Sequence, residues 1–152
     1  MSGGAESTIL LVEDDPDDVL LIQRAVRKAK IANPLQVVGN GDDAVAYLAG
    51  EGPYSDRERY PLPVLMLLDL KLPRRSGLEV LAWLRRQPGD LRRLRVVILT
   101  SSRETSDVNT AHELGANSYL VKPPTLDELI ELIRALDLYW LILSEAPDVH
   151  VP

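Results

Sequence analysis

The sequence of 152 residues contains no cysteine, which excludes disulfide bonds, thiolate metal sites and thiol catalysis. It has no amino-terminal signal core, and no run approaches the roughly 20 apolar residues of a membrane span. Basic residues are outnumbered by acidic ones, 17 to 23, and the net charge of −6 disfavours non-specific binding to nucleic acid or anionic lipid. We therefore expect a cytoplasmic protein that binds neither nucleic acid nor membranes.

Short apolar runs alternate with segments of helical periodicity along the chain. The runs are rich in β-branched and aliphatic residues on both faces, as buried parallel strands are. They lie at 8–12, 35–38, 64–68, 95–99 and 118–121. Five strands alternating with five helices predict an α/β fold, a doubly wound five-stranded parallel sheet with right-handed crossovers.

The acidic segment after the first run has the features of a helix start. Asp15 before Pro16 is typical of an N-cap followed by the first helical residue. Asp17 and Asp18 lie in the turn where the helix dipole favours negative charge. We therefore assign these three acids to capping and dipole pairing and not to metal binding. Further along, Ser76 three residues before Glu79 predicts a capping box.

The length predicts one domain, at 8–143, between a flexible leader at 1–7 and a tail at 144–152. The connection at 50–63 is long, polar and interrupted by three prolines, so it is either functional or tolerated surface. The arginines at 85–95 cluster locally. In an acidic chain we interpret them as a solvated helix end and loop.

Polar side chains follow four of the five predicted strands. Glu13 and Asp14 follow the first strand and Asp69 the third, while Thr100 follows the fourth and Lys122 the fifth. The carboxyl ends of parallel strands form the edge where open α/β sheets bind ligands. Carboxylates gathered there predict a divalent-metal site. Together with a hydroxyl and a lysine they suit Mg²⁺-dependent phosphoryl chemistry.

This ordered set resembles the receiver domain of two-component response regulators, the CheY-like family. The resemblance spans residues 8 to about 137, and it includes Leu72-Pro73 with Gly77, and Tyr119 with Lys122-Pro123. It implies a flavodoxin-like sheet of strand order 2-1-3-4-5. It also implies a phosphoacceptor signalling protein that is not an enzyme beyond assisting its own phosphorylation and dephosphorylation.

By this resemblance Asp69 is the phosphoacceptor, attacking the phosphohistidine of a sensor histidine kinase. Asp14 and Asp69 would bind Mg²⁺ directly and Glu13 through water, with the backbone carbonyl of Lys71 completing the protein's ligands. The cation would offset the repulsion between the acids and the phosphoryl oxygens.

The family also implies a two-state switch. Lys122 would pair with a phosphoryl oxygen, from a cis Lys122–Pro123 peptide. Thr100 would bond another oxygen, and its movement would let Tyr119 turn inward and change the surface around the fourth and fifth helices. The sequence departs from the family at Lys71, whose side chain lies at the mouth of the predicted site, so the lifetime of the acyl phosphate is open.

Softer features narrow the resemblance. The loop at 50–63, residues 117–120 with Lys122, and the aromatic pair Tyr139 and Trp140 resemble single-domain regulators paired with bacteriophytochrome histidine kinases. Those regulators imply a homodimer that uses the extended carboxyl end and signals through protein contacts. Trp140 has an alternative, packing against its own domain.

Two other functions are compatible with a doubly wound sheet. A Mg²⁺-dependent phosphohydrolase of the haloacid dehalogenase type also uses an Asp nucleophile, but it expects Asp-x-Asp where this chain has Asp69-Leu70-Lys71. A flavin-binding module would need phosphate-binding loops, whereas Glu13 and Asp14 would repel the FMN phosphate. The phosphohydrolase is the alternative that we keep.

Overall fold

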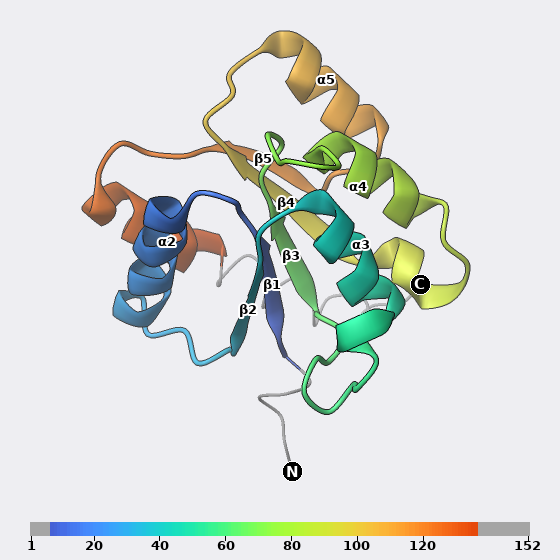
Figure 1. Cartoon of the computed structure of the whole chain (residues 1–152). Coiled ribbons are helices and arrows are strands. Elements are labelled where there is room, and N and C mark those ends of the chain that lie inside the picture. The colour runs from blue at the N-terminus through green and yellow to red at the C-terminus, as the bar shows by residue number, and fades with distance from the viewer. Residues whose placement is uncertain (1–6, 137–152) are drawn as a thin grey trace, which may run out of the picture. The chain divides into compact units, whose positions relative to one another are not determined.

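The computed structural model describes residues 7–136 (Figure 1). The backbone of these residues divides into two compact units. The first comprises residues 7–19 and 33–122, and the second comprises 20–32 and 123–136. The predicted single domain at 8–143 stays a prediction.

Several predicted features lie outside the described residues. They are nearly all of the leader, the tail at 144–152, and the last stretch of the final helix with Tyr139 and Trp140.

The first unit holds the whole sheet. Its strands are β1 (Ile9–Val12), β2 (Leu35–Val38), β3 (Leu65–Leu68), β4 (Arg95–Thr100) and β5 (Ser118–Val121). All four neighbouring pairs are parallel, and the order is β2-β1-β3-β4-β5. The predicted fold class and strand order are therefore confirmed, and every predicted strand end agrees to within one residue.

The five predicted helices are also present. They are α2 (Pro16–Lys28), α3 (Gly41–Ala49), α4 (Gly77–Arg85), α5 (Thr105–Glu113) and a helix at 126–136. Two short 3₁₀ helices, η1 (Gly52–Tyr54) and η2 (Gly89–Arg93), occupy connections. Within residues 7–136, no helix combines the length and apolar character needed to cross a membrane.

Two of the predicted helix starts have the expected capping contacts. The Asp17 N–H donates to the Asp15 carboxylate at 2.9 Å, which satisfies a donor that the helix itself leaves unpaired. Ser76 and Glu79 exchange both bonds of a capping box, at 2.8 and 3.2 Å. Local side-chain chemistry therefore places the starts of α2 and α4.

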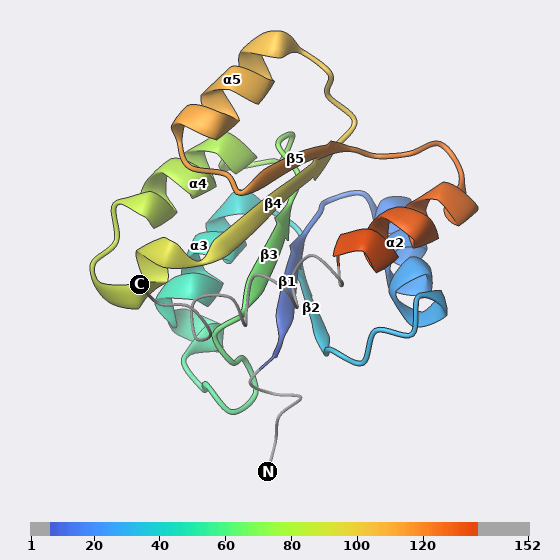
Figure 2. The ribbon, with the colours of Figure 1, turned by 180° about the vertical axis from the view of Figure 1, so that it is seen from behind.

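The core of the first unit lies between the sheet and the three helices α3, α4 and α5, which run along one face (Figures 1 and 2). Alternate strand residues face these helices, because successive side chains of a strand point to opposite faces. They are Leu10, Val12, Met66, Leu68, Val96 and Ile98. The intervening side chains, such as Leu11 and Leu67, are also buried, as the apolar runs predict.

The second unit contains the later turns of α2 and the helix at 126–136, which lie side by side in both views (Figures 1 and 2). Ile22, Ala25 and Val26 are buried on α2, as are Leu129 and Ile133 on the other helix. Their spacing of three and four residues is that of one helix face, as the sequence predicts.

The connection at 50–63 is a folded element. Arg57 donates to the carbonyl oxygens of Tyr47 and Leu48, in the last turn of α3, at 2.8 and 2.9 Å. The Tyr47 oxygen also accepts from the Gly50 N–H at 3.1 Å, so Arg57 adds to the cap at the end of this helix. Arg57 also donates to the carbonyl of Tyr60. The rings of Tyr47, Tyr54 and Tyr60 contact one another, with centroids 5.1 to 5.9 Å apart. One cation and three aromatic rings therefore order this loop.

Arg85 has a structural role that the interpretation as a solvated helix end misses. Its guanidinium donates to the carbonyl oxygens of Gly115, Arg92 and Leu94 at 2.7 to 2.8 Å, and to the Asn117 side chain at 3.3 Å. Burial lowers the pKa of this guanidinium. The interpretation is therefore wrong for Arg85, whose planar donors join the end of α4 to the segments at 92–94 and 115–117.

We predict that Arg85→Ala lowers the free energy of unfolding by about 1–3 kcal/mol, because carbonyl acceptors lose a charged donor. Arg86→Ala is the matched control. Arg86 is exposed and its side chain makes no hydrogen bond or ion pair with residues 7–136, so its loss should change stability by less than about 0.5 kcal/mol. Urea unfolding of both variants measures the difference. Equal midpoints for the two variants would contradict the role of Arg85.

Candidate functional site

Asp69 is fixed at the carboxyl end of β3 by its backbone. Its N–H donates to the carbonyl of Val12 at 3.1 Å, and the Gly77 N–H donates to the carbonyl of Leu70 at 2.9 Å. A Cβ atom on Gly77 would lie 2.1 Å from the Asp69 carbonyl oxygen. Only glycine allows α4 to begin this close to the strand end, so the first residue of α4 helps to place Asp69.

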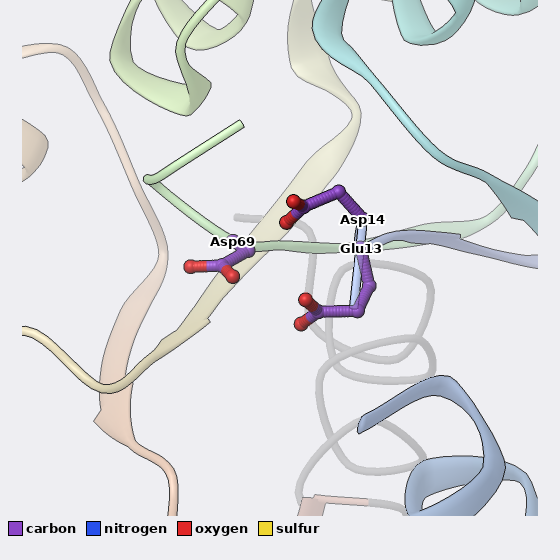
Figure 3. Close-up of side chains that lie close together, drawn as sticks. All are labelled: Glu13, Asp14 and Asp69. Carbon is purple, nitrogen blue, oxygen red and sulfur yellow. The ribbon is translucent and has the colours of Figure 1, made fainter. Parts of the chain in front are cut away.

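Three predicted acids converge at this edge of the sheet (Figure 3). Glu13, Asp14 and Asp69 each offer a carboxylate oxygen, and these oxygens all lie within 4.8 Å of one another. Glu13 and Asp69 are buried, at 2% and 7% exposure, while Asp14 is exposed. The donor atoms are all hard oxygens, which suit Mg²⁺, Mn²⁺ or Ca²⁺ and do not suit softer metals.

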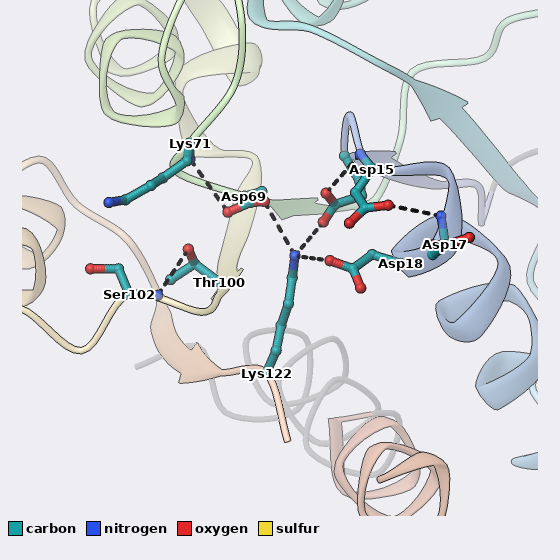
Figure 4. A network of polar contacts seen from close by, with 9 residues as sticks. Asp15, Asp17, Asp18, Asp69, Lys71, Thr100, Ser102 and Lys122 are labelled. Carbon is teal, nitrogen blue, oxygen red and sulfur yellow. Dashed lines mark hydrogen bonds and ion pairs between the residues drawn. The ribbon is translucent and has the colours of Figure 1, made fainter. Parts of the chain in front are cut away.

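Lys122 reaches the same cluster from the end of β5 (Figure 4). Its Nζ donates to Glu13 Oε1 at 2.6 Å, Asp18 Oδ2 at 2.8 Å and Asp69 Oδ2 at 3.2 Å. Three carboxylates thus contact one ammonium group, and Asp14 adds a fourth carboxylate next to Glu13 and Asp69. When all are ionised, three negative charges remain, which favours the binding of a divalent cation.

The protonation of this cluster follows from burial and from these contacts. Burial raises the pKa of Glu13, against hydrogen bonds from Lys122 and from the Asp15 N–H. Burial alone would lower the pKa of Lys122, but hydrogen bonds to Asp18 and Glu13 and the charge of Asp69 raise it. Lys122 is therefore a permanent cation at neutral pH.

One prediction about Lys122 is wrong. No peptide bond within residues 7–136 is cis, so the Lys122–Pro123 bond is trans. The trans form is favoured before proline by about 0.5–1 kcal/mol. The lysine side chain is long enough to reach Glu13 and Asp69 in this form.

The two predicted switch residues are connected through Ser102. Thr100 is fully buried at the end of β4, and its Oγ1 accepts a hydrogen bond from the Ser102 N–H at 3.4 Å. The Tyr119 hydroxyl donates to the Ser102 carbonyl at 3.0 Å. Burial raises the pKa of Tyr119. The structure brings the two residues to one loop, and their switching roles stay predictions.

Lys71 lies beside Asp69. Its backbone N–H donates to Asp69 Oδ1 at 3.4 Å, and its exposed side chain extends away from the Lys122 ammonium group (Figure 4). The role of its carbonyl oxygen as a metal ligand stays a prediction.

Asp18 makes a contact at the site that the sequence interpretation missed. The assignment of Asp15 to capping is confirmed, but Asp18 contacts Lys122 in addition to lying in the first turn of α2. A signal was available, because α2 begins directly after the acidic pair. The first turn of such a helix lies at the same sheet edge as the pair, so its acids can reach the site.

Comparison with known proteins identifies the family. Residues 9–134 match the response regulator receiver domain. The chain belongs to the receiver-domain family of response regulators. This family consists of phosphoacceptor signalling proteins, so the prediction that the chain is not an enzyme is confirmed and the phosphohydrolase alternative is set aside.

The relatives of this receiver include phytochrome response regulators. Response regulator Rcp1 of Synechocystis sp. is 40% identical over 133 residues, covering 88% of either chain. A crystal structure of phosphorylated RcpA, a cyanobacterial phytochrome response regulator, has a TM-score of 0.81 at 36% identity and covers 89% of this chain and 94% of its own.

Two further solved structures are similar to this receiver. The Mn²⁺-bound form of Rcp1 has a TM-score of 0.78 at 39% identity, covering 89% of this chain and 94% of its own. The bacteriophytochrome response regulator RtBRR has a TM-score of 0.72 at 45% identity, covering 84% and 75%. The predicted resemblance to bacteriophytochrome-associated regulators is therefore confirmed.

Proposed function

We propose that this receiver accepts a phosphoryl group on Asp69 from a phytochrome-type sensor histidine kinase, in a reaction that requires Mg²⁺, and then signals through protein contacts. One observation carries the proposal. The Asp69 carboxylate lies at the strand end within reach of both the Glu13–Asp14 pair and the Lys122 ammonium group. The phytochrome link rests on the relatives, which include phytochrome and bacteriophytochrome response regulators.

The chemistry assigns a role to each group. An Asp69 carboxylate oxygen attacks phosphorus in line with the bond to the kinase histidine nitrogen, so a P–O bond forms as the P–N bond breaks. Glu13, Asp14 and Asp69, with the Lys71 carbonyl, would hold Mg²⁺, which would neutralise charge on the transferring group. Lys122 then stabilises a phosphoryl oxygen of the aspartyl phosphate through its positive charge.

Asp69→Asn tests this assignment. We expect the wild-type receiver to take up radiolabel from an autophosphorylated phytochrome-type kinase, and the amide variant to take up none, because an amide oxygen is not a comparable nucleophile. Chelation of Mg²⁺ by EDTA should also abolish transfer to the wild type. Asp17→Asn is the matched control, since this exposed acid lies outside the metal cluster, and it should be labelled normally.

A kinase panel separates the two parts of this proposal. If the Asp69→Asn variant takes up as much label as the wild type, Asp69 is not the phosphoacceptor. Faster transfer from every non-phytochrome kinase than from the phytochrome-type kinases would reject only the assigned partner.

Lys71 gives a second test. Its ammonium group lies on an exposed side chain next to the phosphoacceptor, where it can attract the phosphodonor or hinder the water that hydrolyses the acyl phosphate. We predict that Lys71→Asn changes the rate of dephosphorylation, measured as loss of label after the kinase is removed. Lys28→Asn, which removes an exposed lysine at the end of α2, is the control. If Lys71→Asn leaves the half-life of the aspartyl phosphate unchanged, Lys71 has no role in dephosphorylation.

We also propose that the receiver forms a homodimer through the fourth predicted helix (α5), the fifth strand (β5), the fifth predicted helix (126–136) and its carboxyl-terminal extension, as the resemblance implies. The apolar extension at 138–143 lies outside the described residues. A symmetric dimer would place this segment against a copy of the same face. Sedimentation with and without beryllofluoride, an acyl-phosphate mimic, should show a dimer in at least one state. A monomer in both states contradicts the proposal.

A further inference from the structure

Asp18 differs from the other acids that contact Lys122. Glu13 and Asp69 belong to the group of three carboxylates that can hold a cation, whereas Asp18 does not. Yet the distance from Lys122 Nζ to Asp18 Oδ2, 2.8 Å, is shorter than the 3.2 Å to Asp69. Asp18 is also 31% exposed, while the Glu13 side chain is 1% exposed. Asp18 is therefore a partner of Lys122 at the rim of the cluster.

The present contacts place Lys122 in competition with a divalent cation. The ammonium group donates to Glu13 Oε1 and Asp69 Oδ2, and both carboxylates are members of the metal cluster. A cation bound by these oxygens would repel the nearby ammonium group. Glu13 and Asp69 would then become weaker partners of Lys122. Asp18 alone among the three would keep a carboxylate fully available to it.

We propose that Asp18 is a positioning residue that holds the Lys122 ammonium group at the rim while a divalent cation takes up the oxygens of Glu13 and Asp69. This proposal rests on the proposed function, in which Lys122 later contacts the phosphoryl group on Asp69. Asp18 already contacts Lys122 in the present structure, where Lys122 is shared with Glu13 and Asp69. Its contact stabilises the cation-bound arrangement more than the present one, because Lys122 then turns from the two ligated carboxylates toward Asp18. Asp18 therefore strengthens cation binding without being a ligand.

The first turn of α2 contains the matched control. Asp17 and Asp18 are adjacent, and both lie where the helix dipole favours an acid. Of these two acids, only Asp18 contacts Lys122. A purely helical role predicts similar effects for both amides. A role through Lys122 predicts an effect for Asp18→Asn alone.

A double-mutant cycle on Mn²⁺ affinity tests the role directly. The cycle compares wild type, Asp18→Asn, Lys122→Met and the double variant, with Mn²⁺ binding to the unphosphorylated protein measured by electron paramagnetic resonance. We expect Asp18→Asn to weaken Mn²⁺ binding about threefold or more in the wild-type background. In the Lys122→Met background, Asp18→Asn should weaken Mn²⁺ binding much less. Lys122→Met alone should tighten binding, because the competing cation is gone.

The other outcomes overturn the proposal. An equal effect of Asp18→Asn in both backgrounds would show a direct electrostatic or folding effect. If Asp18→Asn weakens Mn²⁺ binding more in the Lys122→Met background than in the wild type, Asp18 is a ligand of the cation. If Asp18→Asn changes Mn²⁺ affinity in neither background, Asp18 serves only the first turn of α2. Urea unfolding checks each variant, and Lys122→Gln replaces Lys122→Met in the cycle if the methionine variant does not fold. No kinase is used, so failure of phosphotransfer to Asp69 and failure of this cycle are distinguishable.

Discussion

The crowding of carboxylates at one edge of the sheet is the constraint on which the site depends. The backbones of Glu13 and Asp69 are fixed by hydrogen bonds to Val38 and Val12 of neighbouring strands, so the sheet holds the carboxylates of Glu13, Asp14 and Asp69 close together. The only ammonium group with a contact to Glu13 or Asp69 in the described part of the chain is that of Lys122. The negative charge that Lys122 does not neutralise can attract a further cation. A receiver needs such a cation, because an anionic side chain has to react with an anionic phosphoryl group.

The sheet and the acidic edge could be predicted from the sequence because their determinants are local. A run such as Leu65–Leu68 identifies a buried strand by its composition, and the residue after it lies at the carboxyl edge in any parallel sheet. The capping box of Ser76 and Glu79 likewise depends on residues three apart. The ends of the predicted strands alone therefore predict Glu13, Asp14, Asp69, Thr100 and Lys122 at one edge of the sheet.

The features that could not be predicted are side-chain contacts between distant segments. Lys122 and Asp18 are 104 positions apart, and Arg85 reaches a carbonyl 30 positions away. Nothing in the local pattern distinguishes Arg85 from Arg86, or Asp18 from Asp17, because each pair shares a helix turn and a charge. The direction in which each side chain leaves the helix decides its partner. This direction also explains why one arginine joins three backbone segments while its neighbour is exposed.

The same reasoning connects the charge cluster to the rest of the domain. The Lys122 N–H donates to the Thr100 carbonyl, and Thr100 is followed by Ser102, whose carbonyl accepts from the Tyr119 hydroxyl. The backbone of Lys122 is therefore bonded to the end of β4, the strand that precedes Ser102. Tyr119 and Lys122 both belong to the segment around β5, so any displacement of the Ser102 loop alters a contact of the same segment that bears the lysine. The predicted coupling between the charge cluster and the surface would therefore need no long pathway, because Lys122 and Tyr119 are three residues apart on one short strand and its end.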